Sequence, residues 1–454
     1  GNRLEDFDVE VESRKRLKGN VYLAKVTRVE PSLQAAFVDY GGNRHGFLAF
    51  SEIHPDYYQI PVADREALIA EDRAEAAKSP EIDEASEDEE SPIETLGGDD
   101  SEEVEARRPA ASQRRHYKIQ EVIKRRQILL IQVVKEERGT KGAALSTYLS
   151  LAGRYCVLMP NTGRGGGISR KIGSLSDRKK LKKIVTDLGI PEGMAVIVRT
   201  AGAERSRAEI RRDYDYLLRL WNQIRELTLN SIAPSLVHEE GDLIKRSIRD
   251  LYTKDIDEVV IHGEDGYRSA KDFMKILIPS HAKKVQKYKE IELPLTHNYG
   301  IDTQLEAIHS SDVHLKSGGY IIINPTEALV AIDVNSGRAT KERNIEETAL
   351  KTNLEAAKEI ARQLKLRDLA GLIVIDFIDM EVNRNQTKVE RAMKEAMRLD
   401  RARIQIGRIS PFGLLELSRQ RLRPSLIETS SEPCPHCKGS GIRRSTETAA
   451  VEVM

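Results

Sequence analysis

The sequence predicts a multidomain protein that combines α/β modules with a small β-barrel. The chain has 454 residues, which is more than one hydrophobic core usually supports, so two to four domains are expected. Short apolar strands separated by turn residues fill residues 19–50. Strands alternate with long amphipathic helices over residues 315–425. The first pattern is typical of a barrel and the second of an α/β module.

The charge distribution indicates an anionic partner. The chain holds 72 Lys and Arg and 72 Asp and Glu, so its net charge is zero. The segment Glu81–Glu105 contains 13 acidic residues and neither Lys nor Arg, which leaves the rest of the chain distinctly basic. Such a basic remainder is typical of proteins that bind nucleic acid. Aromatic residues make up only 5%, so we expect no broad surface for base stacking.

Cysteine content and hydropathy place the chain in the cytoplasm. Three cysteines are too few for a disulfide framework and fit a reducing compartment. The chain has no apolar run of membrane-spanning length and no signal peptide. It starts at Gly1 within a strand-like pattern, so we interpret it as a fragment of a longer protein.

The barrel is predicted from four short apolar strands. They are Val21–Val26, Ala35–Val38, His45–Ala49 and Ile128–Val134, and Gly41–Asn43 provides a hairpin turn. Strands of this length and spacing are typical of a closed barrel of the OB type.

A long stretch inside the predicted barrel does not fit a barrel. Residues from about 60 to 115 are rich in Glu, Asp, Ala, Ser and Pro. Because they offer little apolar surface to bury, we expect a mostly disordered surface insertion. We also considered that this acidic insertion shields a nucleic-acid channel electrostatically.

Two further modules follow in the sequence. Residues 148–240 mix strands (Tyr155–Met159, Ala195–Arg199) with helices (Lys179–Leu188, Arg212–Leu229). Residues 245–308 form a further region, with the predicted helices Asp242–Tyr252 and Ser269–Leu277 and the strand Glu258–His262.

The strand and helix pattern of residues 315–425 is the clearest in the chain. It predicts strands at Tyr320–Ile323, Leu329–Val334, Leu372–Phe377 and Ile404–Ile406, and helices at Ile345–Leu366 and Gln386–Leu399. The strands are almost continuously apolar, and they alternate with helices. We therefore expect a mostly parallel sheet that is covered on both faces.

Two aspartates end neighbouring strands of this predicted sheet. Asp333 follows the apolar run Leu329–Ile332, and Asp376 follows Leu372–Ile375. One crossover helix joins the two strands, so they should be parallel neighbours with both carboxylates at one edge. Asn335 lies two residues after Asp333 and should share its face, whereas Asp379 is expected to face elsewhere.

The two aspartates predict a magnesium site. Two nearby carboxylates without a cation repel each other and raise each other's pKa, and a divalent metal removes that repulsion. Carboxylate, amide and water oxygens suit Mg²⁺ or Mn²⁺. A single strand-end Asp more often caps a strand or helix, but two on adjacent strands with a third polar group favour a metal.

Six motifs in one order make the chain resemble the ribonuclease E/G family. The resemblance covers nearly the whole chain apart from the acidic insertion. The motifs are EERGTKGAAL at 136–145, VRTAG at 198–202, AIDVNSG at 331–337, IVIDFIDM at 373–380, RARIQ at 401–405 and CPHC at 434–437.

The resemblance implies an endoribonuclease of RNA processing and mRNA decay. Such enzymes cut single-stranded AU-rich RNA, are stimulated by a 5′-monophosphate, and leave a 5′-phosphate and a 3′-hydroxyl. Asp333 and Asp376 would hold the catalytic Mg²⁺, and Asn335 would support them. The implied subdomains are an RNase H-like fold (1–17 and 245–308), an OB-type RNA-binding barrel (18–147), a 5′-sensor (148–244), a DNase I-like catalytic fold (309–430), a zinc-link (431–445) and a tail (446–454).

The resemblance also implies RNA contacts and a phosphate pocket. The RNA-contacting positions would be Phe37, Phe47, Lys135, Lys141 and Arg403. The positions that sense a 5′-phosphate would be Gly153, Val157, Arg170, Arg199 and Thr200. From the residues alone, each Phe is as well explained as a core aromatic, Arg403 as a buried salt bridge, and Arg199 as a surface arginine.

Cys434 and Cys437 form half of a zinc site. A structural Zn²⁺ takes four ligands, and Cys156 lies in another module. Either His436 contributes or a second copy of the chain supplies the other cysteine pair. The resemblance implies the second, a homodimer that shares one zinc. In the family, a small domain absent here pairs dimers into tetramers. An absent C-terminal tail recruits degradosome proteins and contacts the inner membrane.

Three other functions remain open on the sequence. The chain could belong to the ribonuclease G branch of the family, which has the same catalytic plan without the tail. It could be a non-catalytic RNA-binding module, although that leaves the paired aspartates unexplained. It could also cut DNA, since an OB barrel is compatible with either nucleic acid.

Overall fold

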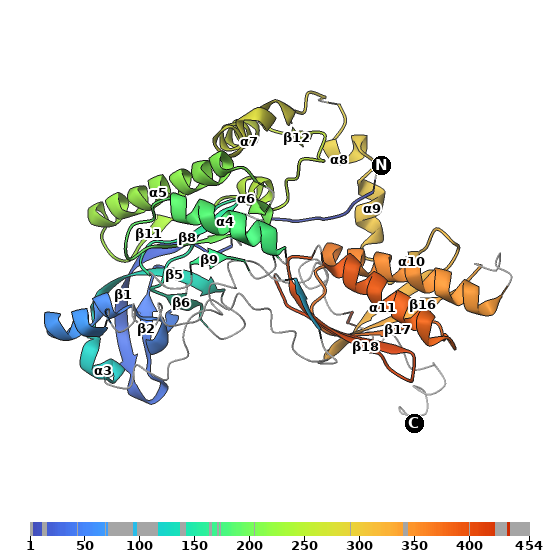
Figure 1. Cartoon of the computed structure of the whole chain (residues 1–454), viewed down its shortest axis with the longest axis horizontal. Coiled ribbons are helices and arrows are strands. Elements are labelled where there is room, and N and C mark those ends of the chain that lie inside the picture. Colours follow the sequence, from blue (N-terminus) through green and yellow to red (C-terminus); the bar gives the residue numbers. More distant parts are fainter. Residues whose placement is uncertain are drawn as a thin grey trace. The chain divides into compact units, whose positions relative to one another are not determined.

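The computed structural model describes two compact units. The first comprises Gly1–Phe7, Glu87–Asp99 and Leu293–Met454, and the second comprises Asp8–Ser86 and Asp100–Glu292. Within them the structure describes residues 3–10, 16–42, 44–68, 70, 94–97, 117–136, 142–162, 166–169, 172, 174–203, 205–290, 292–338, 344–398, 400–422 and 434–435. Figure 1 labels many of the helices and strands of both units.

The second unit begins with a closed five-stranded barrel. Its strands follow the order β1-β2-β3-β6-β5, and β5 pairs back onto β1. Only β3 and β6 pair in parallel. The predicted small barrel is confirmed and is compatible with the OB type. Its elements are β1 (Val21–Glu30), β2 (Ala35–Asp39), β3 (Gly46–Ala49), α3 (Ile119–Val122), β5 (Ile128–Lys135) and β6 (Ala144–Ser146).

A four-stranded sheet follows the barrel in this unit, and it contains the predicted strands near Tyr155–Met159 and Ala195–Arg199. β8 (Cys156–Met159) and β10 (Ala195–Val198) lie at its centre, and every residue of both strands is buried. Helix α5 begins at a capping box in which Ser206 and Glu209 bond each other's backbone amides. The other elements are β7 (Leu151–Ala152), β9 (Gly167–Ile168), α4 (Leu175–Asp187), α5 (Arg207–Asn230) and β11 (Ser235–His238), of which β11 pairs with barrel strand β1.

The second unit ends in a small helical region. β12 and β13 pair in parallel, and α6 and α7 pack around Met274 and Phe273. Its elements are α6 (Leu243–Asp250), β12 (Val259–Ile261), α7 (Glu264–Leu277), the 3₁₀ helix η7 (Pro279–Lys284) and β13 (Val285–Lys287).

The first unit is built on a seven-stranded sheet of order β14-β15-β16-β17-β19-β18-β4. Among the described residues of this sheet, only β16 and β17 pair in parallel, so the prediction of a mostly parallel sheet is wrong. Short loops turn β15 back onto β16 and β18 back onto β19, and such hairpins are antiparallel. The elements are α8 (Leu295–Asn298), α9 (Asp302–Ala307), β14 (Asp312–His314), β15 (Tyr320–Pro325), β16 (Leu329–Asn335), α10 (Ile345–Leu366), β17 (Gly371–Asp376), α11 (Asn383–Met397), β18 (Arg403–Ile409) and β19 (Leu414–Arg419).

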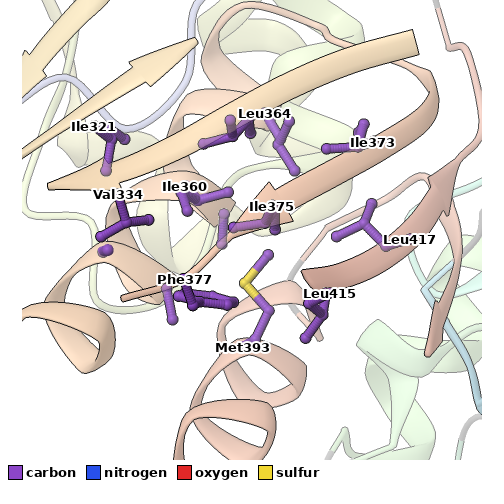
Figure 2. Close-up of a cluster of buried hydrophobic side chains, with 14 of the residues drawn as sticks. Ile321, Val334, Ile360, Leu364, Ile373, Ile375, Phe377, Met393, Leu415 and Leu417 are labelled. Carbon is purple, nitrogen blue, oxygen red and sulfur yellow. The ribbon is translucent and has the colours of Figure 1, made fainter. Parts of the chain in front are cut away.

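Helices α10 and α11 cover one face of this sheet (Figure 1). In β16 the side chains of Val330, Ile332 and Val334 are buried while Ala331 and Asp333 between them are exposed. The expected cover on both faces is therefore wrong for the described residues. Figure 2 shows side chains of the covered face, and the labelled ones are Ile321, Val334, Ile360, Leu364, Ile373, Ile375, Phe377, Met393, Leu415 and Leu417.

A short strand from the acidic insertion completes this sheet. β4 (Glu94–Gly97) pairs antiparallel with β18, and Leu96 packs against the core of the first unit. Residues 62–68 of the insertion are helical. These two segments have secondary structure within an insertion that was expected to be mostly disordered, and most of the insertion lies outside the described residues. The physical reason is that β18 offers unpaired backbone groups at the sheet edge, which Leu96 and its neighbours can satisfy.

In the part of the chain that the structure describes, no helix combines the length and the apolar character needed to cross a membrane.

The β4 pairing predicts that Leu96→Asp loosens the sheet edge. Placing a charge against the apolar core should detach β4, and backbone amides of Arg403–Ile409 should exchange with deuterium about tenfold faster. Hydrogen-exchange mass spectrometry checks this. The control is Val62→Asp, which alters an exposed residue of the same insertion. Equal exchange rates in the wild type and the Leu96→Asp variant would contradict the pairing.

Candidate functional site

The structure brings Asp333 and Asp376 together as direct neighbours. They face each other in the register of the parallel pair β16–β17, and both side chains are exposed on the uncovered face of the sheet. The adjacency depends on α10, which carries the chain from the end of one strand to the start of the next. The sequence prediction of their proximity is confirmed. They lie on an open face, however, and not in a crevice between layers.

Asn335 lies on the same face and contacts Asp333. Its side-chain Nδ2 donates to Asp333 Oδ2 over 2.9 Å. The two-residue spacing along β16 explains the shared face, since side chains alternate along a strand. As predicted, an amide therefore accompanies the two carboxylates.

The electrostatics of the pair show mutual repulsion. The pKa of Asp376 is raised by partial burial, by the charge of Asp333 and by the charge of Asp379. The charge of Asp379 thus reaches Asp376, and the expectation that the Asp379 side chain faces elsewhere stays a prediction. Asp379 also lies close to Gly413: a Cβ there would be 3.1 Å from Asp379 Oδ1, and Gly413 has a φ of +79°.

A buried asparagine holds the segment that follows Asp376. Asn353 of α10 is fully buried; its Nδ2 donates to the carbonyl of Ile378 over 2.8 Å, and its Oδ1 accepts from the Ile378 amide over 3.1 Å. Both bonds fix the backbone between Asp376 and Asp379. The sequence analysis missed Asn353, and its only signal is a polar residue on the apolar face of a predicted helix.

The residues present fit a hydrated divalent cation. Among the described residues no group of three His, Cys, Asp or Glu side chains surrounds a common point, so a closed protein cage is not formed. Two exposed carboxylates and an amide do suit Mg²⁺, which commonly keeps several waters and takes one or two carboxylates. Burial and the neighbouring carboxylates raise the pKa of Asp376, and a bound divalent cation would offset that repulsion.

Arg403 lies on the same open face but at the far end of the strands. It is exposed, so the alternative of a buried salt bridge is wrong. The Arg403 carbonyl accepts a hydrogen bond from the Gln420 amide. Arg419, the residue before Gln420, pairs with Gly371 at the start of β17. That register places Arg403 about six residues, or roughly 20 Å, from Asp376 along the sheet.

A β-bulge places another arginine nearer to the aspartates. The pairing of β18 with β19 shifts between Ile406 and Ile409, and Arg408 in this bulge is exposed. Ile409 then aligns with Leu415, which pairs with Ile375, the neighbour of Asp376. The sequence analysis missed Arg408. Gly407 was the available signal, because an isolated glycine inside a strand pattern indicates a bulge.

Phe37 and Phe47 lie opposite each other on the outside of the barrel. They are cross-strand partners on β2 and β3, their ring centroids are 6.1 Å apart, and the rings are at 73°. Ala36, Val38 and Leu48 fill the barrel core instead. The guanidinium of Arg28 lies 4.7 Å from the Phe37 ring centroid. The alternative of two core aromatics is therefore wrong.

Lys135 is the last residue of β5 and is exposed. Lys141, the other predicted cation of the barrel, lies outside the described residues, as does Arg170 of the predicted phosphate pocket.

Three of the predicted phosphate-sensing residues meet in the second unit. Arg199 is 8% exposed; its Nη1 donates to the carbonyl of Gly153 over 2.7 Å and to Asp250 Oδ1 over 2.9 Å. Thr200 follows directly and is exposed. The interpretation of Arg199 as a simple surface arginine is thus wrong, because a carboxylate already orients its guanidinium.

Val157 is fully buried and packs with Met159, Ala195 and Ile197. Its backbone pairs with both neighbouring strands. Its side chain therefore supports the sheet beneath the Gly153 loop.

A buried carboxylate that the sequence analysis missed shapes this loop. Asp213 of α5 accepts hydrogen bonds from the amides of Arg154, Tyr155 and Cys156 over 3.1, 2.8 and 2.9 Å. Its burial raises its pKa, although these bonds act in the opposite direction. A Cβ at Gly153 would lie 2.6 Å from Asp213 Oδ2, which explains the glycine there.

Cys434 is exposed and Cys156 is buried. Burial raises the pKa of the Cys156 thiol well above its usual range, which disfavours the thiolate that a zinc ligand needs. Cys437 lies outside the described residues, so the zinc site stays a prediction.

The comparisons with known proteins agree with the geometry. The model of the ribonuclease E/G family matches residues 150–422. Ribonuclease E of Haemophilus influenzae is 44% identical over 454 residues, which are 100% of this chain and 43% of that protein. Ribonuclease E of Escherichia coli is 44% identical over 455 residues and 38% of its length. The chain thus spans about two fifths of the length of these two ribonuclease E proteins.

Ribonuclease G of Escherichia coli is also similar, at 32% identity over 454 residues, which are 100% of this chain and 83% of that protein. The family model covers more than half of the chain, and these relatives cover all of it. The chain therefore belongs to the ribonuclease E/G family.

Proposed function

We propose that this chain is the catalytic region of a Mg²⁺-dependent endoribonuclease. It cleaves single-stranded AU-rich RNA and leaves a 5′-phosphate and a 3′-hydroxyl, in RNA processing and mRNA decay. The observation that carries the proposal is the direct pairing of Asp333 with Asp376 on an exposed sheet face, with Asn335 bonded to Asp333. The names of the relatives, ribonuclease E and ribonuclease G, support RNA as the substrate.

The roles of the residues follow from their chemistry. Asp333 and Asp376 hold the Mg²⁺, and Asn335 orients Asp333. When bound, the ion polarises a phosphate and lowers the pKa of an attacking water. Asn353 keeps the backbone after Asp376 in place. The open face leaves room for an extended strand, and Arg403 and Arg408 supply cations for its phosphates.

RNA binding is proposed for the outside of the barrel. Phe37 and Phe47 offer two adjacent ring faces or edges for bases, while Lys135 and Lys141 contact the backbone. Stacking on the rings and ionic contacts to the backbone would bind single strands with little sequence specificity, since every base has a face that can stack.

The 5′-monophosphate is proposed to bind at Gly153, Val157, Arg170, Arg199 and Thr200. Asp250 orients the Arg199 guanidinium, and the Thr200 hydroxyl is exposed beside it. A guanidinium and a hydroxyl can hold a terminal phosphate together.

The assembly proposed for the whole protein is a homodimer that shares one structural Zn²⁺ through Cys434 and Cys437 of each copy. Pairing of dimers into a tetramer, recruitment of degradosome proteins and contact with the inner membrane belong to segments of the full-length protein. The proposed location is the cytoplasm.

The catalytic proposal predicts that Asp333→Asn together with Asp376→Asn abolishes cleavage while RNA still binds. A 5′-monophosphorylated AU-rich oligonucleotide with Mg²⁺ is the substrate, and the rate should fall by about 10²–10³-fold or more. Glu327→Gln, an exposed change at the opposite end of β16, is the control. If the double variant and the wild type cut equally, the active site lies elsewhere.

The metal site predicts a pH-dependent stability that needs no substrate. A raised Asp376 pKa destabilises the charged native state, so the penalty is complete at neutral pH and disappears as pH falls below the usual carboxyl range. Without Mg²⁺, Asp333→Asn should therefore raise Tm at pH 7, on the order of 1 °C, and lose that gain below about pH 4.

Mg²⁺ should raise the Tm of the wild type at pH 7 but leave that of Asp333→Asn unchanged, because the ion binds only the native carboxylate pair. Differential scanning fluorimetry measures both effects. Equal Mg²⁺ responses of the two proteins would exclude this pair as the cation site.

The barrel predicts that Phe37→Ala weakens binding of a non-cleavable single-stranded RNA by about 1–3 kcal/mol, because a stacking ring is lost. The salt dependence of binding should stay unchanged, since no phosphate contact is removed. Fluorescence anisotropy at several salt concentrations gives both. Leu33→Ala, an exposed apolar change on the same barrel, should bind as the wild type does. An unchanged affinity of Phe37→Ala would refute stacking at this ring.

A further inference from the structure

A small cavity in the second unit has no part in the proposed catalysis or RNA binding. Its volume is about 190 Å³. Four segments surround it: the loop before β8, the start of α5, the residues after α6 and the start of η7. Its main lining residues are Arg154, Tyr155, Arg205, Tyr252, Lys254 and His281.

Arg154 is a buried cation without a counter-carboxylate. It is 4% exposed, and its Nη1 donates to the carbonyls of Ile248 and Arg249 over 2.6 and 3.2 Å, while Nη2 donates to that of Tyr252. Its Nε is buried and has no hydrogen-bond acceptor among the described residues. No ion pair joins it to an acid within that part of the chain. Burying an uncompensated charge is costly.

Aromatic rings offset only part of that cost. The Arg154 guanidinium carbon lies 5.3 Å from the ring centroid of Tyr155 and 5.5 Å from that of Tyr252, and the Arg205 guanidinium lies 5.7 Å from the Tyr155 ring. These cation–π contacts stabilise the guanidinium groups. They add no negative charge, so the cavity stays electropositive.

The rim of the cavity is also cationic. Arg205 and Lys254 face one carboxylate, that of Glu209. Glu209 is already engaged, because it accepts hydrogen bonds from the Ser206 amide and hydroxyl over 3.0 and 2.9 Å. Three fixed positive charges, those of Arg154, Arg205 and Lys254, therefore oppose one negative charge, and Oε2 of that carboxylate is held by the helix cap.

The pKa of His281 is sensitive to the positive charges around the cavity. Its Nδ1 is 2.9 Å from the Tyr252 hydroxyl. Burial lowers the pKa of His281, and so do the charges of Lys284, Lys254, Arg154 and Arg205. An anion in the cavity would act against those cations and raise the pKa of His281.

We propose that this cavity binds a small phosphate-bearing anion. Arg154 lies at its base, Arg205 and Lys254 at its rim, and Ser280 and His281 offer neutral donors. Its volume is close to that of an engineered cavity of about 150 Å³ that binds benzene and below the roughly 300 Å³ of sites for larger ligands. A phosphate group with a few further atoms fits, so the ligand is a small phosphate monoester and not an RNA strand.

The cavity shares a loop with the proposed 5′-sensor. Arg154 follows Gly153, whose carbonyl accepts from Arg199, and Asp213 clamps the amides of the same loop. An anion that pulls on Arg154 therefore acts on the backbone that positions Arg199. This consequence rests on the proposed function, whereas anion binding in the cavity does not.

The test is isothermal titration calorimetry of the full chain with inorganic phosphate and with glycerol 3-phosphate. The rim variant Arg205→Gln plus Lys254→Gln should weaken binding about tenfold or more. Arg268→Gln plus Lys275→Gln removes two exposed charges from α7 and should bind as the wild type does. If both double variants weaken binding equally, or neither does, the proposal fails.

Two further measurements separate the cavity from the sensor. In NMR titrations, ligand should raise the pKa of His281 in the wild type but not in the rim variant; an unchanged pKa in the wild type overturns the proposal. Arg199→Gln should keep the anion binding. If it abolishes binding, the phosphate occupies the sensor. If the rim variant alone loses discrimination between 5′-phosphorylated and 5′-hydroxyl RNA, the cavity takes an RNA end instead.

Discussion

The parallel pairing of β16 with β17 is the constraint on which the candidate catalytic site depends. Helix α10 leaves the end of β16 and returns the chain to the start of β17, so the two strands run the same way. Asp333 and Asp376 are therefore directly opposite each other in the register. An antiparallel pair of strands would have placed the two residues at opposite ends of the sheet. Every other neighbour pair in this sheet is antiparallel, so the site sits on the one exception.

Because helices cover only one face of the sheet among the described residues, the paired aspartates are accessible on the other face. α10 and α11 bury one face, and strand alternation sends the aspartates to the other. Charged side chains there keep contact with water, so they can carry like charges at a tolerable cost. The same exposed face can accept an extended polymer. The buried Asn353 links the covered layer to the loop after Asp376, and so the core determines the backbone of the site.

In the second unit, by contrast, several charged side chains are buried. Asp213 satisfies three amides of one loop, Asp250 orients Arg199, and the Arg154 guanidinium caps the end of α6 without an ion pair to an acid among the described residues. Buried charges are expensive unless they are paired, so each fixes a neighbouring segment firmly. Both the proposed 5′-sensor and the anion cavity use the loop that these groups hold.

The sequence by itself determined the barrel, the modules and the paired aspartates. These depend on local patterns: short apolar runs such as Ala35–Val38, turn residues at Gly41–Asn43, and a single helix between two apolar strands. It also determined the family, because six motifs recur in order. The residue types at Asp333, Asp376 and Asn335 were enough to predict oxygen ligands for a metal.

Only the tertiary structure decided the pairing partners and the faces. β19 and β4 complete the sheet through contacts distant in sequence, so neither the antiparallel majority nor the open face follows from local pattern. From the sequence alone, Phe37 could face the barrel core or the solvent. In the structure Ala36 and Val38 fill the core, so Phe37 faces outward. The roles of Asp213 and Arg154 depend on burial against segments that are distant in sequence. Long-range packing, and not the local sequence, determines the free-energy cost of burying their charges.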